Sequence, residues 1–114
     1  MDALLGAAGL GDIGKAFPDS DPQLEGISSL ILLERTSDLL RQAGYEPVNV
    51  DVTLVAQKPK VGPYIPQMRA KLAAVLGLPT EQVNVKATTE EGLGFTGTGQ
   101  GMAAHAVALL EKLR

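Results

Sequence analysis

The spacing of hydrophobic residues predicts two helices in the first half of the chain. Asp2 to Leu10 is rich in alanine and leucine and is predicted to be helical. A second helix is predicted over Ser28 to Ala43, where leucines recur on one side at helical spacing. Either Ser28 or Ser29 can cap its N-terminus, and Gly44 stands where helices commonly end.

The middle of the chain changes from a strand pattern to a helix pattern and back. Apolar residues take every second position from Val48 to Gln57, which predicts a strand with one apolar and one small polar side, interrupted by Val55. A third helix is predicted to follow, with Pro66 in its first turn and Gly77 at its end. Val83 to Thr88 alternates again and predicts a short second strand.

The secondary structure of the last part of the chain is predicted from composition and intrinsic propensity, because no clear periodic pattern is present there. Thr89 to Gly101 contains five glycines and is predicted to be a loop. Met102 to Arg114 favours a helix by intrinsic propensity, because alanine and leucine dominate it.

Composition indicates one globular domain with an aliphatic core. The chain has 114 residues, of which 45% are hydrophobic, but only two tyrosines and two phenylalanines are aromatic. The net charge of −3 gives no electrostatic reason to bind nucleic acid or an anionic membrane. The absence of cysteine excludes disulfides and thiolate zinc sites and is compatible with a reducing cytosol. No apolar run approaches the ~20 residues of a membrane-spanning helix.

An acidic loop, Gly11 to Pro22, carries the first candidate chemistry. Its twelve residues include two glycines, two prolines and three aspartates, which predicts turns in place of a helix or a sheltered strand. Ionised aspartates accept hydrogen bonds from hydroxyl-bearing ligands, although such a loop can also be a simple acidic surface turn. Gly9 to Gly14 matches the letters GxGxxG, but a dinucleotide fingerprint needs a preceding strand, and a helix is predicted there.

Four further segments carry a family resemblance: Val55 to Lys60, Pro63 to Arg69, Val83 to Thr89, and Leu93 to Gly97. Together with the acidic loop they closely resemble the 2-C-methyl-D-erythritol 2,4-cyclodiphosphate synthases of the non-mevalonate isoprenoid pathway. The resemblance implies a single α/β (α+β) domain, with a small mixed sheet and helices packed on one face. It also implies a homotrimer whose sheets face the three-fold axis and whose active sites lie between neighbours, and it makes the last segment a strand.

The implied reaction is an intramolecular phosphoryl transfer, catalysed by a lyase. The 2-phosphate of 4-diphosphocytidyl-2-C-methyl-D-erythritol 2-phosphate attacks the β-phosphate, closes the cyclic diphosphate and expels CMP. Such a step depends on alignment and charge neutralisation more than on acid–base groups. The family implies a location in the bacterial cytoplasm or the plastid stroma.

The resemblance also implies which residues act. Asp12 to Gly14 bind the ribose, Phe17 to Asp21 border the methylerythritol phosphate, and the loop Ala56 to Gly62 holds cytosine. Thr89 and Glu91 are the expected catalytic residues, with Glu91 holding Mg²⁺ or Mn²⁺ through the diphosphate. The full set of expected substrate-binding residues is Asp12, Ile13, Gly14, Phe17, Pro18, Asp19, Ser20, Asp21, Ala56, Gln57, Lys58, Pro59, Lys60, Val61, Gly62, Thr88, Phe95 and Thr98.

Some of these residues have structural alternatives. Asp21, directly before a proline, also suits a turn, and Lys58 to Lys60 could instead blunt a sheet edge with charge. The chain departs from the family at Glu90, where a third threonine is usual. It departs again at Thr98, where many members have an arginine, and at Gln100, where they have a glutamate. The Thr98 departure removes a cation and a bidentate donor.

Zinc is the main difference from the family. Family members hold zinc with an Asp-x-His pair on an N-terminal strand and a histidine early in the first long helix. This chain opens inside that helix, and its one histidine, His105, is expected to have a packing or interface role. We therefore expect no tight zinc site, and weak or absent turnover. Two hypotheses remain: the enzyme without its N-terminal metal-binding segment, or a non-catalytic trimeric scaffold or cytidine-nucleotide-binding module.

Overall fold

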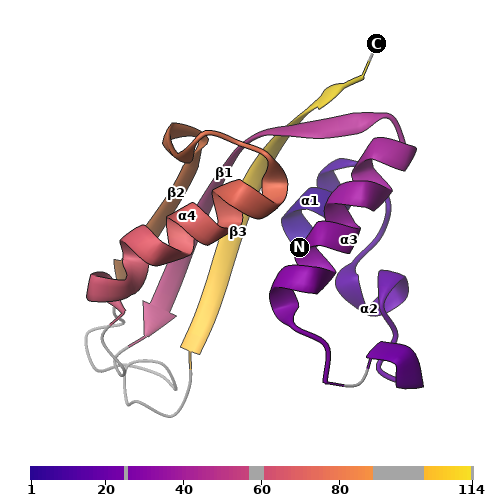
Figure 1. Cartoon of the computed structure of the whole chain (residues 1–114), viewed down its shortest axis with the longest axis horizontal. Helices are drawn as coiled ribbons and strands as arrows, with labels where there is room; N and C mark the ends of the chain where they lie inside the picture. Colours follow the sequence, from indigo (N-terminus) through magenta and orange to yellow (C-terminus); the bar gives the residue numbers. More distant parts are fainter. Residues whose placement is uncertain (25, 57–60, 89–101, 114) are drawn as a thin grey trace.

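The computed structural model describes residues 1–24, 26–56, 61–88 and 102–113, which form a small mixed sheet with helices packed against it (Figure 1). The helices and strands follow one another as α1 (Asp2–Ala7), α2 (Ile13–Ala16), η1 (Pro22–Leu24), α3 (Ser29–Gln42), β1 (Tyr45–Ala56), η2 (Gly62–Tyr64), α4 (Ile65–Leu76), η3 (Thr80–Gln82), β2 (Val83–Thr88) and β3 (Met102–Lys112).

The sheet has the strand order β2-β1-β3, with the longest strand, β1, in the centre. β1 and β2 are parallel and end together, because Val55 lies opposite Thr88. β3 is antiparallel to β1 and begins at the same edge, with Met102 opposite Ala56. Helix α4 provides the crossover that a parallel pair requires. This architecture confirms the α/β fold with a mixed sheet that the resemblance implied.

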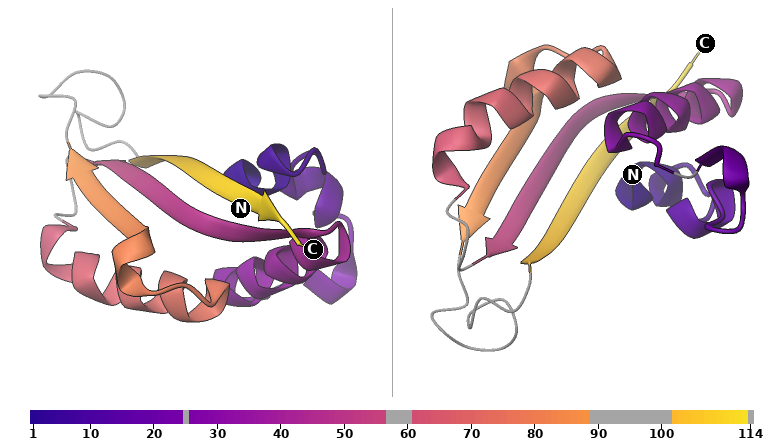
Figure 2. Two further views of the ribbon diagram at one scale, coloured as in Figure 1. Left: turned by 90° about the horizontal axis from the view of Figure 1, so that it is seen from above. Right: turned by 60° about the horizontal axis from the view of Figure 1, so that its bottom comes forward.

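Helices α3 and α4 lie together on one side of the sheet, as Figure 2 shows from above. Helix α1 contacts the edge strand β3 and, less extensively, helix α3. We call the opposite side, away from α3 and α4, the outer face.

The central strand is longer and less regular than the alternation predicted. It begins at Tyr45, three residues before the predicted start, because the end of β3 pairs with it there: Tyr45 lies opposite Lys112, and the Leu113 amide donates to the Gly44 carbonyl at 2.8 Å. A bulge between Pro47 and Asn49 takes Val48 out of the regular pairing. The assignment of Val48 to the apolar side of a regular strand was therefore wrong.

The final segment is a strand, so the helix favoured by its propensity is wrong. β3 pairs with β1 along almost all of its length. These tertiary hydrogen bonds outweigh the small per-residue preference of alanine and leucine for helix. The strand that the resemblance implied is confirmed.

Helix α1 ends three residues earlier than predicted. The Leu10 amide donates to the Leu5 carbonyl at 2.8 Å and the Gly9 amide to the Gly6 carbonyl at 3.0 Å. Gly9 has a φ of +72°, so this is a Schellman motif that closes the helix.

The other predicted helix ends are confirmed. The Ser28 hydroxyl caps α3 by accepting a hydrogen bond from the Leu30 amide, and Gly44 follows the helix with a φ of +89°. Helix α4 has Pro66 in its first turn and Gly77 in a left-handed conformation at its end.

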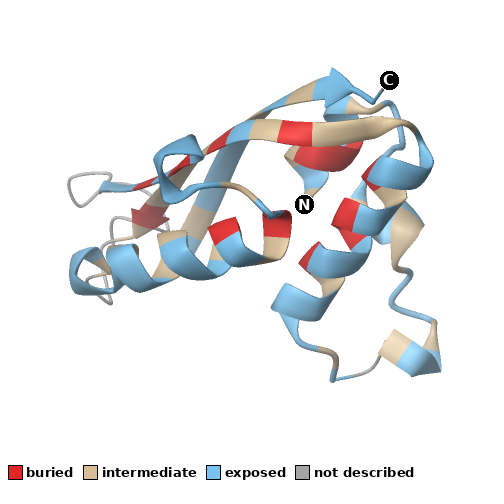
Figure 3. Ribbon diagram, turned by 45° about the horizontal axis from the view of Figure 1, so that its top comes forward, coloured by how far each residue is buried: buried red, intermediate tan, exposed pale blue. Residues whose placement is uncertain are grey.

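The core is aliphatic, as the composition predicted. It lies where α1, α3 and α4 meet β1 (Figure 3). The buried residues that cluster there are Leu4, Leu33, Leu40, Val50 and Leu76, and further buried apolar side chains are Leu5, Val55, Ala73, Val83 and Val85. No described helix has the length and apolar character needed to cross a membrane.

Candidate functional site

The acidic loop is more ordered than its composition predicted. Ile13–Ala16 forms one helical turn, α2, so the exclusion of helix from this loop was wrong. The turn exists because the Asp12 carboxylate accepts a hydrogen bond from the Lys15 amide at 2.8 Å and caps its N-terminus. The carboxylates of such a loop were expected either to cap neighbouring backbone groups or to bind a polar ligand, and the first of these roles is confirmed for Asp12.

A second aspartate fixes the loop to helix α1. The Asp2 carboxylate accepts a hydrogen bond from the Ile13 amide at 2.7 Å, eleven residues away in sequence. Asp2 and Asp12 together satisfy two of the free amides at the start of α2. The start of α2 is therefore fixed by a contact to helix α1 and by its own capping residue before any ligand binds.

Asp21 occupies the turn position that its sequence context suggested. Its carboxylate accepts a hydrogen bond from the Gln23 amide at 2.9 Å, which is an Asx turn, and its own amide donates to the Pro18 carbonyl. This confirms the turn role for Asp21. Neither carboxylate oxygen of Asp19 takes part in a hydrogen bond or ion pair within the described part of the chain.

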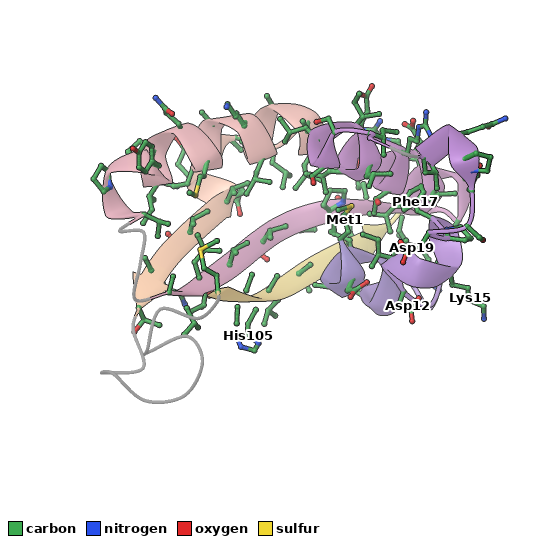
Figure 4. The ribbon with its side chains drawn as sticks, turned by 90° about the horizontal axis from the view of Figure 1, so that it is seen from below. Met1, Asp12, Lys15, Phe17, Asp19 and His105 are labelled. Atoms are coloured by element: carbon green, nitrogen blue, oxygen red, sulfur yellow. The ribbon has the colours of Figure 1, made fainter. Side chains whose placement is uncertain are left out.

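These turns border a cavity of about 540 Å³. Its lining combines polar and apolar residues of the acidic loop with apolar side chains from η1, the segment that follows it, and α3. The lining residues are Phe17, Pro18, Asp19, Ser20, Asp21, Pro22, Leu24, Ile27 and Leu32. Figure 4 shows Asp12, Lys15, Phe17 and Asp19 together at the end of the molecule that carries the acidic loop. All five residues expected to border the methylerythritol phosphate, Phe17 to Asp21, therefore line one cavity.

The second group of expected site residues lies where the strands end. Ala56 closes β1, Thr88 closes β2, and the two strands end side by side. Val61 and Gly62 open the turn that leads into α4, with the Tyr64 amide donating to the Val61 carbonyl at 2.9 Å. The sheet thus brings together the segments expected to bind cytosine and diphosphate. Several of the expected residues of this group lie outside the described residues: Gln57, Lys58, Pro59, Lys60, Thr89, Glu91, Phe95 and Thr98.

The two groups are far from each other within one chain. In Figures 1 and 2 the acidic loop lies beside α3, whereas the ends of β1 and β2 lie toward the other end of the long axis. The long axis of the molecule measures 46 Å. One chain therefore presents two separate halves of the expected site.

The outer face of the sheet is open and mixed in character. Val107 and Leu109 are 74% and 56% exposed, and His105 points away from the helices in Figure 4. Beside them, the Lys86 ammonium donates to the Asp51 carboxylate at 2.8 Å. This bond, with a second from the Asn84 amide, holds the pKa of Asp51 below its usual value.

Metal-ligating side chains do not gather in the described ranges. No group of three or more histidine, cysteine, aspartate or glutamate side chains is placed to hold a metal ion there. Within those ranges His105 lies on β3, with Thr53 as its cross-strand neighbour.

A comparison with protein families identifies the family of this chain. The profile of the YgbB family matches residues 1–111. The chain belongs to the YgbB family. Members named 2-C-methyl-D-erythritol 2,4-cyclodiphosphate synthase include those of Symbiobacterium thermophilum, 57% identical over 110 residues, and Syntrophomonas wolfei, 58% identical over 111 residues. These alignments cover 96% and 97% of this chain and 70% and 71% of the relatives.

Solved structures of YgbB-family proteins have the same fold. The structure described as "IspF (Plasmodium falciparum) CDP complex" is 31% identical, with a TM-score of 0.84 over 99% of this chain and 67% of that one. The bifunctional IspDF of Campylobacter jejuni is 42% identical, with a TM-score of 0.93 over 98% of this chain and 30% of that one. The family resemblance read from the motifs is confirmed.

Proposed function

We propose that this chain carries the substrate-binding body of a 2-C-methyl-D-erythritol 2,4-cyclodiphosphate synthase. The observation that carries the proposal is identity of more than half over almost the whole chain to relatives with that name. In the reaction an oxygen of the 2-phosphate forms a bond to the β-phosphorus. The bond from that phosphorus to the CMP phosphate oxygen breaks, and CMP leaves with the electron pair.

Asp12 and Asp19 are the residues we assign to substrate hydroxyls. One oxygen of the Asp12 carboxylate is used by the Lys15 amide, which leaves the other to accept a ribose hydroxyl. Asp19 borders the 540 Å³ cavity, and we assign its carboxylate to a hydroxyl of the methylerythritol unit. Because the loop is already hydrogen-bonded, little ordering is needed when substrate binds.

We further propose that the complete site forms between copies of this chain, most simply in a homotrimer. Two features support this: the acidic loop and the strand ends are separated within one chain, and the outer face exposes Val107 and Leu109. A neighbouring copy can supply the missing half of each site, and association can cover the apolar part of the outer face.

The metal assignments follow from donor chemistry. Carboxylate and hydroxyl oxygens of Glu91 and Thr89 suit Mg²⁺ or Mn²⁺, which would neutralise charge on the diphosphate. Zinc does not fit the described residues, which gather no suitable cluster, and the chain has one histidine and no cysteine. The chain's own contribution to catalysis is therefore to bind, align and orient the two phosphates.

The test is to measure binding and turnover on the same preparation. Calorimetry with CDP and Mg²⁺ is expected to show saturable binding, because the nucleotide contacts form in the ground state. Release of CMP from the authentic substrate, followed with and without added zinc, reports the chemical step. Absence of CDP binding by a folded protein would contradict the proposal. Because turnover is expected to be weak or absent without the zinc ligands, CMP release above the uncatalysed rate would favour the enzyme over a cytidine-nucleotide-binding module.

A further inference from the structure

Helix α2 is oriented by hydrogen bonds more than by packing. It has four residues, none of them buried, and it lies at the edge of the molecule, away from the sheet (Figure 1). A short exposed turn of this kind buries too little apolar surface to fix its own orientation. The contacts that orient it are therefore the polar ones at its ends.

Helix α1 provides one of these contacts from a well-packed base. Leu4 and Leu5 of this helix are 3% and 0% exposed, and Met1 packs against the core cluster that contains Leu4. Asp2 lies in the first turn of α1, and its carboxylate accepts the hydrogen bond from the Ile13 amide at 2.7 Å. A hydrogen bond of this length to a carboxylate is charge-assisted. Asp2 therefore links the core of the molecule to a turn that buries no residue of its own.

The chain returns to Asp2 through two left-handed glycines. Gly9 and Gly11 lie between α1 and α2 and have φ values of +72° and +90°, which glycine adopts without strain. They reverse the chain, so that the Ile13 amide reaches the first turn of α1 and not its end.

Ile13 transmits this constraint to both ends of α2. Directly before it, Asp12 uses one carboxylate oxygen to cap the Lys15 amide at 2.8 Å, which leaves the other oxygen for the ribose hydroxyl assigned above. Directly after the turn, the Phe17 amide donates to the Ile13 carbonyl at 2.8 Å, and Phe17 lines the 540 Å³ cavity. The residue that Asp2 holds thus lies between the assigned ribose contact and the cavity assigned to the methylerythritol unit.

We propose that Asp2 is a positioning residue for nucleotide binding, which orients α2 so that the free oxygen of Asp12 meets the ribose hydroxyls. The inference rests on the proposed function, from which it takes the role of Asp12. Without the Asp2 acceptor the Ile13 amide would bond to water, and α2 would sample orientations in which Asp12 misses the ribose. The loss would fall on the part of the affinity that depends on the ribose hydroxyls.

The test compares CDP with 2′,3′-dideoxy-CDP, which lacks both ribose hydroxyls, by calorimetry with Mg²⁺ on the full chain. In the parent, the dideoxy nucleotide is expected to bind about tenfold more weakly, because it cannot donate to the Asp12 carboxylate. In Asp2→Ala, the affinity for CDP is expected to fall about tenfold, while the affinity for the dideoxy nucleotide changes little. A merely structural role would weaken both nucleotides equally and leave their ratio unchanged.

Two further variants make the comparison specific. Asp2→Asn keeps a side-chain oxygen that can accept from the Ile13 amide, so it is expected to retain the preference for CDP to within about threefold. Asp38→Ala removes an exposed aspartate of α3 that has no hydrogen bond or ion pair among the described residues, and this matched control is expected to bind both nucleotides as the parent does. Thermal unfolding of each variant establishes that it is folded.

The outcomes separate this inference from the function on which it rests. A parent chain that does not distinguish the two nucleotides would overturn the ribose assignment and this inference with it. A parent that distinguishes them, together with an Asp2→Ala variant that distinguishes them equally well, would overturn this inference alone. Loss of the preference in Asp2→Asn as complete as in Asp2→Ala would also overturn it, because the hydrogen bond to Ile13 would then not be what orients the loop.

Discussion

At the scale of single residues, the aspartates of the acidic loop have structural as well as chemical roles. The sequence predicted their chemistry from residue type, but Asp12 also caps α2 and Asp21 also makes an Asx turn. The contact between Asp2 and Ile13 could not be predicted, because no local pattern brings a helix residue and a loop amide together across eleven positions. Residue type predicts what a side chain can bind, whereas the fold decides which partner it meets.

The two roles of Asp12 can be separated by two substitutions. Asp12→Asn keeps an oxygen that can cap the Lys15 amide, whereas Asp12→Ala removes the cap. We expect both variants to weaken CDP binding, and only Asp12→Ala to lose about 1 kcal/mol of unfolding free energy. Calorimetry and urea denaturation measure the two effects. Equal stability of the two variants would contradict the capping role, and normal CDP affinity in both would contradict the ribose assignment.

At the scale of helices and strands, the sequence predicted an element correctly where its local signals agreed with its tertiary pairing. Helix α3 and strand β2 were predicted well because capping residues, periodicity and packing all point the same way. β3 could not be predicted from propensity, since its alanines and leucines are strand residues only because β1 pairs with them. The early start of β1 depends on the same pairing, which the sequence of β1 does not encode.

The pairing of β1 with β3 also places two like charges opposite each other. Glu46 and Glu111 are cross-strand neighbours, and a shared hydrogen bond and repulsion from Glu46 raise the pKa of Glu111. A raised carboxyl pKa means that the folded state binds the proton more tightly than the unfolded state. Protonated Glu111 can share a hydrogen bond with Glu46 and so stabilises the folded state. This contribution is fully present below 4.5, the ordinary pKa of a glutamate, and is lost as the pH rises through the higher pKa of Glu111 in the folded protein.

We expect Glu111→Gln to remove this pH dependence. Compared with the parent chain, the variant is expected to be more stable at neutral pH, because the repulsion between the two carboxylates is gone. Urea denaturation from pH 4 to pH 7.5 measures the difference, with Glu81→Gln as an exposed control on η3. A parallel pH profile for Glu111→Gln and the parent would show that the two carboxylates do not interact.

At the scale of the whole molecule, the chain presents two half-sites and an open apolar strip on the outer face. The alternation of β1 did not predict this strip, because its exposed apolar residues, Val107 and Leu109, lie on β3, for which local propensity favours a helix. It could not predict the distance between the acidic loop and the strand ends, which depends on how α3 and the sheet pack. The arrangement favours association over a self-sufficient monomer.

Substitution on the outer face tests this association. Val107 is 74% exposed, so Val107→Glu is expected to leave the fold intact while placing a charge in the proposed interface. Sedimentation at micromolar concentration is expected to show association weakened about tenfold or more. Ile31→Glu, at an exposed apolar position on α3, is the control. A parent chain that sediments as a monomer would contradict the proposed assembly.

The most direct test of the central claim is complementation between two defective variants. Asp12→Asn breaks the ribose contact of the acidic-loop half of every site while keeping the cap of α2, and Glu91→Gln with Thr89→Val breaks the strand-end half, so neither homo-oligomer is expected to bind CDP with Mg²⁺ normally. When the two variants are refolded together in equal amounts, an intact half from each can meet between copies. We predict that calorimetry then recovers about one quarter of the sites at the parent affinity, the proportion that random assembly gives for a site built from two neighbours. Recovery of no sites in a mixed oligomer would contradict the account, because it would mean that each site is built within one chain.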